Sequence, residues 1–104
     1  MISALEKLLG TPRDGALLRY SLGLEYARAG ERGRAIEHLR EAVARDPLYS
    51  AAWKTLGKTL AEMDRNADAL DAYRRGIEAA GKNGDKQAQK EMTVFARRLE
   101  KGRG

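Results

Sequence analysis

The chain has 104 residues, of which 34% are charged and 42% apolar, and this balance is typical of one folded, helix-rich domain rather than a disordered segment. It has no cysteine, which excludes disulfides and thiolate chemistry and fits the reducing cytoplasm, where we expect the protein. The sequence lacks a signal-peptide pattern and any apolar run near the roughly 20 residues of a membrane span, so we expect no membrane association.

The first half of the chain has helical periodicity. Apolar residues three and four apart predict a short helix over residues 3–9 and longer helices over 15–29 and 33–45. Asp14 is the expected N-cap of the second helix, and Asp46-Pro47 is expected to end the third. The residues expected to face the core are Ile2, Leu5, Leu9, Leu18, Leu22, Tyr26, Ala29, Ile36, Leu39, Ala42 and Val43.

The second half repeats this organisation. Helices are predicted over residues 51–63, 67–80 and 86–101, with a loop over 81–84. Ser50, Asn66 and Asp85 are the expected N-caps. The residues expected to face the core are Trp53, Leu56, Leu60, Leu70, Tyr73, Ile77, Ala88, Met92, Phe95 and Leu99.

Gly23 and Gly57 lie 34 residues apart, and their surroundings match each other. The matched pairs are Leu22 with Leu56, Ala27 with Ala61, Ala35 with Ala69, and Arg40 with Arg74. A fixed period of this length indicates stacked repeats, which present extended surfaces rather than catalytic pockets. We expect the small residues of the repeat to remove bulk where two antiparallel helices cross.

These residues make the chain resemble the tetratricopeptide-repeat (TPR) family. Residues 16–49 match its pattern with Leu22, Gly23, Tyr26, Ala35, Leu39, Ala42 and Pro47, and residues 50–83 match it with Trp53, Leu56, Gly57, Leu60, Ala69 and Tyr73. The pattern is broken by Arg19 in place of Trp, and by Gly76 and Gly81 at the end of the second repeat. The resemblance implies a single all-α domain of helix-turn-helix repeats, with an N-terminal helix and link over 1–14 and a capping helix over 85–101.

We find no constellation of catalytic residues in the sequence. His38 is the single histidine, is expected to face solvent and has no serine placed beside it. With neither cysteine nor paired histidine, we predict no metal site, no cofactor and no enzymatic activity.

In TPR stacks the first helix of each pair lines the concave face, which the resemblance implies is the binding surface. The apolar stripe of the last helix is shifted by one residue from the period of 34. This shift implies a loop one residue longer before that helix, and it puts further basic residues on the concave face. We therefore predict a basic peptide-binding groove formed by Tyr20, Leu24, Arg28, Lys54, Lys58, Lys86, Gln89, Lys90 and Arg97.

Such a groove favours an acidic peptide or a C-terminal carboxylate of a partner protein. Chaperone tails are not the predicted ligand, because Lys58 stands where their clamp would have an asparagine. One alternative is nucleic-acid binding through the surface of net charge +5, disfavoured because exposed aromatics are scarce and no basic helix is continuous. Others are a scaffold or regulatory subunit of a larger complex, and weak self-association that covers apolar ends.

Overall fold

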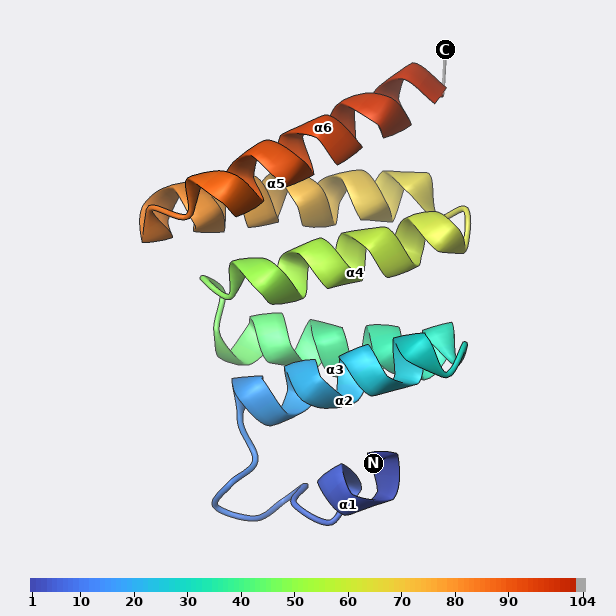
Figure 1. Ribbon diagram of the computed structural model, residues 1–104, viewed down its shortest axis with the longest axis vertical. Coiled ribbons are helices and arrows are strands. Elements are labelled where there is room, and N and C mark those ends of the chain that lie inside the picture. The colour runs from blue at the N-terminus through green and yellow to red at the C-terminus, as the bar shows by residue number, and fades with distance from the viewer. Residues whose placement is uncertain (103–104) are drawn as a thin grey trace.

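The computed structural model describes residues 1–102, and all the regular elements it shows there are helices. They are α1 (Ile2–Glu6), α2 (Ala16–Arg28), α3 (Arg32–Arg45), α4 (Ser50–Glu62), α5 (Asn66–Asn83) and α6 (Lys86–Gly102). The predicted all-α class is confirmed. The helices stack one after another along the long axis of a molecule that measures 44 × 29 × 18 Å (Figure 1).

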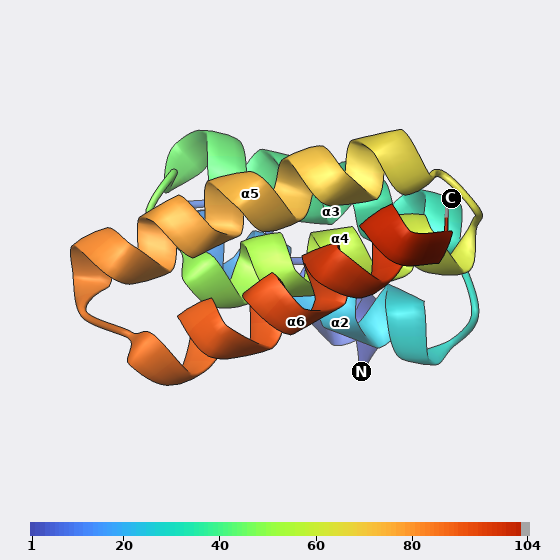
Figure 2. The same ribbon diagram turned by 90° about the horizontal axis from the view of Figure 1, so that it is seen from above.

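Neighbouring helices pack as antiparallel pairs, α2 with α3 and α4 with α5, and α6 packs on α5. Viewed from above, α2 and α6 lie on the same side of α4, and α3 and α5 lie on its other side (Figure 2). The core runs between these two layers and contains fully buried Leu22, Leu39, Leu60 and Met92. The layer of α2, α4 and α6 is the one that positions the candidate site.

Three glycines allow the helices to approach closely. A Cβ atom on Gly23 would lie 2.6 Å from the side chain of Leu39, and one on Gly57 would lie 2.5 Å from the ring of Tyr73. Gly76 also belongs to this set, since its Cβ would lie 2.4 Å from Met92 Sδ. At Gly76 the departure from the repeat pattern is therefore a packing requirement of α6, and the glycine does more than end the repeat.

Three of the four predicted N-caps are wrong. Ser50 and Asn66 lie inside α4 and α5, so the cap positions fall on Tyr49 and Arg65, neither of which makes a side-chain capping bond. Asp14 precedes the cap position of α2 by one residue, and its carboxylate binds elsewhere. Asp85 does cap α6, by accepting a hydrogen bond of 3.1 Å from the N–H of Ala88.

The predicted loop over residues 81–84 is also wrong, because α5 continues to Asn83. Gly84 ends it with a left-handed φ of 71°, and the N–H of Asp85 donates back to the carbonyl of Ala80 over 2.9 Å. The irregularity before α6 is thus a longer helix, instead of the expected longer loop. Gly81 fits inside this extension, where a Cβ would lie 3.0 Å from Gln89 Nε2.

Most predicted core residues are buried. The half-buried ones are Ile2, Leu5, Leu9, Trp53, Ile77, Phe95 and Leu99. Ala29 is exposed, since α2 ends one residue before it. Trp53 is half-buried, and its indole N–H donates to the carbonyl of Pro47 over 2.8 Å while the guanidinium of Arg75 lies over the ring. Ala96 is buried on α6, although the predicted core lacked it.

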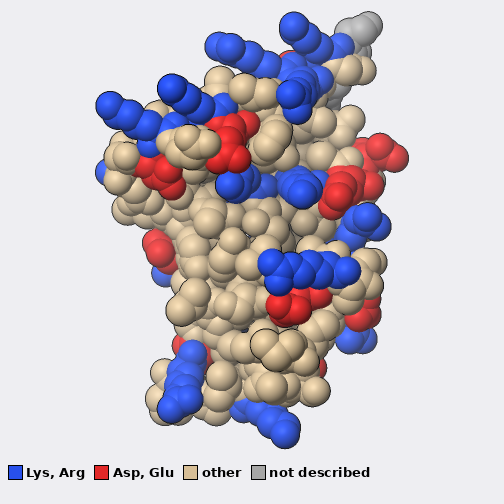
Figure 3. Space-filling view, in the orientation of Figure 1, with Lys and Arg blue, Asp and Glu red and all other residues tan. Residues whose placement is uncertain are grey.

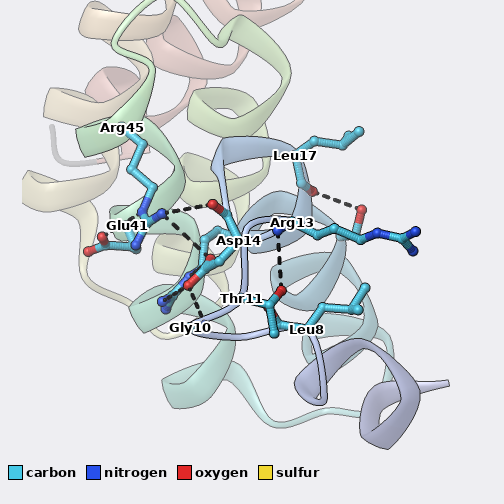
Figure 4. A network of polar contacts seen from close by, with 10 residues as sticks. Leu8, Gly10, Thr11, Arg13, Asp14, Leu17, Glu41 and Arg45 are labelled. Atoms are coloured by element: carbon cyan, nitrogen blue, oxygen red, sulfur yellow. Dashed lines mark hydrogen bonds and ion pairs between the residues drawn. The ribbon is translucent and has the colours of Figure 1, made fainter.

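The link between α1 and α2 is fixed by Asp14 (Figure 4). Its carboxylate accepts hydrogen bonds from Arg19 Nε over 2.9 Å and from the N–H of Gly10 over 3.0 Å, and Arg45 lies 3.6 Å away. Mainly through the Arg19 bond, these donors lower the pKa of Asp14 to about 2. Nearby, the hydroxyl of Tyr26 donates to Glu6 over 2.7 Å and ties α1 to α2.

Candidate functional site

A hollow of about 510 Å³ opens on the face formed by α2, α4 and α6. This is the face seen in Figure 3, where tan surface lies between basic and acidic side chains. All three helices contribute to its wall, as expected for the first helices of stacked pairs. The lining residues are Leu24, Ala27, Arg28, Lys54, Thr55, Lys58, Thr59, Glu62, Glu91 and Phe95.

The hollow has apolar and polar parts. Leu24 and Ala27 of α2 and Phe95 of α6 supply the apolar surface. Thr55 and Thr59 add little polarity, because their hydroxyls donate to carbonyls one turn back in α4, over 3.1 and 2.8 Å. A bound segment would therefore meet mostly carbon atoms between the charged groups.

Ion pairs balance most of the charges around the hollow. Lys54 Nζ lies 3.6 Å from a carboxylate oxygen of Glu91, and Arg28 pairs with neighbouring Glu25. Glu62 pairs with Arg32 over 3.6 Å. Within the described residues Lys58 makes no ion pair, and its side chain is exposed. Lys58 is thus the positive charge in the hollow that remains open to a ligand.

The structure brings together Leu24, Arg28, Lys54 and Lys58 of the predicted site residues. Tyr20 lies outside the hollow, where its ring packs against Tyr49 with centroids 4.9 Å apart. On α6 the lining residues are Glu91 and Phe95, whereas Lys86, Gln89, Lys90 and Arg97 do not line the hollow.

The reason is the way α6 is rotated about its axis. The extension of α5 moves the start of α6, so that Glu91 and Phe95, one turn apart, face Lys54 and the apolar wall. The prediction assumed a one-residue shift from the period of 34, and that shift points to the other side of the helix. One sequence feature could have indicated the side of α6 that faces the hollow. Glu91 is an acidic residue of α6 that can pair with a lysine of α4, and it does pair with Lys54.

His38 was expected to face solvent, but its ring stacks on that of Tyr26 with centroids 5.5 Å apart and planes within 3°. Its Nδ1 is buried and has no hydrogen-bond partner. Burial is the main cause that lowers the pKa of His38. The histidine therefore fills space beside α2 as a neutral ring.

The described residues include no group of three or more His, Cys, Asp or Glu side chains that could hold a metal ion. None of the helices from α1 to α6 is both long and apolar enough to cross a membrane.

Residues 13–101 match the family model of the bacterial transcriptional activator domain. A TPR repeat-containing protein of Pseudomonas aeruginosa is 50% identical over 103 residues, which are 99% of this chain and 98% of that protein. The chain belongs to this domain family and is a TPR protein.

Solved structures agree with this assignment. A protein of Bordetella parapertussis, 43% identical, superposes with a TM-score of 0.82 over 98% of this chain and 89% of that one. The Sgt2 TPR domain of Aspergillus fumigatus, 30% identical, gives 0.82 over 99% of this chain and 69% of that one. The TPR assignment makes the chain a protein-interaction module.

Proposed function

We propose that this TPR protein holds a segment of a partner protein in the concave hollow and catalyses no reaction itself. The observation that carries the proposal is the hollow of about 510 Å³, in which apolar Leu24 and Phe95 lie near an unpaired Lys58. An apolar side chain of the partner would bury itself against carbon, while a carboxylate would bind the ammonium group.

The charge of the hollow narrows the choice of ligand. Its lining has three basic residues and two acidic ones, so its net charge is +1 and it does not form a continuous row of basic side chains. A single carboxylate, on a side chain or at a C-terminus, complements it better than a run of acids, which would meet Glu62 and Glu91. The hollow has no asparagine, so chaperone tails are not the proposed ligand.

The test is a selection of peptides from a displayed library, followed by affinity measurements with the purified chain. Lys58→Glu should weaken binding of the selected peptides by about tenfold or more, because it replaces the attracting charge with a repelling one. Lys82→Glu is the matched control, since this lysine is equally charged but lies outside the hollow and pairs with Glu78. It should leave affinity unchanged.

Phe95→Ala separates the apolar contribution from the charge, and should weaken the same peptides without changing the salt dependence of binding. Equal affinity of the wild type and both hollow variants would refute the proposed site. We also propose a cytoplasmic location, which cell fractionation would test. Self-association is proposed to be weak at most, which sedimentation velocity would test.

A further inference from the structure

The terminal helix α6 carries much of the positive charge of the protein. Its 17 residues include five basic and two acidic side chains, a net charge of +3 out of +5 for the whole chain. In the space-filling view, basic side chains gather at the end of the molecule that α5 and α6 form (Figure 3).

Both acidic residues of α6 are engaged by neighbouring helices. Glu91 pairs with Lys54 of α4 over 3.6 Å, and Glu100 pairs with Arg74 of α5 over 3.4 Å. These pairs take up both carboxylates of α6. The remaining basic side chains of the helix have no acidic partner on α6 itself.

Lys86, Lys90, Arg97 and Lys101 follow one another at spacings of four, seven and four residues, which places them along one side of the helix. We call these four residues the basic strip. All are exposed, and none makes an ion pair within residues 1–102. At 1.5 Å per residue the strip is about 22 Å long. The strip thus consists of two basic pairs, 86/90 and 97/101, on the exposed side of α6.

We propose that the basic strip binds the phosphate backbone of double-stranded nucleic acid. A row of exposed cations that make no ion pairs complements a regular row of phosphates, and such binding needs no apolar contact. It does not depend on the concave hollow, which opens on another side of α6 through Glu91 and Phe95.

The composition of the strip disfavours other partners. Protein interfaces have an apolar centre in which lysine is depleted, whereas the exposed large apolar residue of α6 is Val94 alone. Single strands bind by stacking on aromatic rings, and the one aromatic of α6, Phe95, faces the hollow. Insertion into a membrane needs a free apolar face, but that of α6 is buried around Met92.

The test is fluorescence anisotropy with a short labelled DNA duplex of random sequence, measured from about 50 to about 200 mM salt. The wild type should bind at low salt and lose affinity steeply as salt rises. The double variant Lys90→Gln, Arg97→Gln should reduce the slope of log affinity against log salt by about two, since each neutralised contact removes about one.

Lys7→Gln with Arg13→Gln is the matched control, because it lowers the net charge equally at the opposite end of the stack, where both side chains are exposed. It should keep the wild-type slope. Equal loss in both double variants, or no wild-type binding at low salt, would overturn the proposal. So would binding of phosphatidylserine vesicles without binding of the duplex. Lys58→Glu should retain the slope of duplex binding within about one unit. A failure of the proposed peptide binding in the hollow is therefore distinguishable from a failure of the proposed duplex binding at the basic strip.

Discussion

The two repeats place glycine at the same position but fill the resulting gap with different side chains. Gly23 of α2 receives the branched aliphatic side chain of Leu39, whereas Gly57 of α4 receives the flat ring of Tyr73. Leucine can change rotamer around an added methyl group, but three atoms of the tyrosine ring lie within 2.9 Å of the position of such a methyl. The two repeats therefore share the glycine, but the second repeat tolerates a larger residue at this position less well than the first.

The turns that follow α2 and α4 also share a backbone conformation but place different residues in it. Gly30 and Asp64, 34 residues apart, both adopt left-handed conformations, with φ of 79° and 58°. The residue after each donates its N–H to the carbonyl five positions back, over 2.9 Å in the first repeat and 3.0 Å in the second. The backbone closes both helices identically, but the second repeat uses a residue with a Cβ atom.

The largest expected effect comes from filling the two glycine gaps. Gly57→Ala should lower the free energy of unfolding by about 2 kcal/mol and Gly23→Ala by about 1 kcal/mol, after overpacking is offset by the better helix propensity of alanine. Urea denaturation of both variants measures the difference. If Gly57→Ala is as stable as Gly23→Ala, the contrast between a rigid and an adaptable neighbour is wrong.

Exchanging the turn residues should have a smaller effect. Asp64→Gly should raise the free energy of unfolding by about 0.5 kcal/mol, because glycine adopts a positive φ without Cβ strain, and Gly30→Asp should lower it by about the same amount. Thermal melts of the two variants check the opposite signs. Destabilisation by Asp64→Gly would show that the aspartate side chain supports its turn.

The smallest expected effect is a change in pH dependence at the start of the first repeat, where Asp14 stands and the second repeat has Leu48. Because the folded-state pKa of Asp14, about 2, lies below its ordinary 3.8, its contribution is complete above about pH 4 and is lost toward pH 2.

In Asp14→Asn the pH dependence of the urea midpoint in this window should therefore become flatter than in the wild type. Asp68→Asn is the control, since its carboxylate pairs with Arg65 at the exposed surface. Identical flattening in both variants would contradict a special role for the Asp14 network.

Several features of the fold could be predicted because they depend on local spacing. Leu22, Tyr26 and Leu56 recur with helical period and are buried, and the glycines mark helix crossings. Helix starts were predicted less well, because a capping residue can shift by one position when its side chain has a better partner. Asp14 shows this, since Arg19 and the N–H of Gly10 compete for its carboxylate.

On its own, the sequence determined the helical repeat, its period and the side of α2 and α4 that faces the hollow, because these follow from residue spacing within single helices. Only the tertiary structure decided how α6 lies against the stack. The added turn of α5 and the packing of Met92 on Gly76 set the rotation of α6. That rotation turns Glu91 and Phe95 toward the hollow and leaves Lys90 and Arg97 outside it. Such a rotation arises from contacts between helices, which spacing along one helix does not specify.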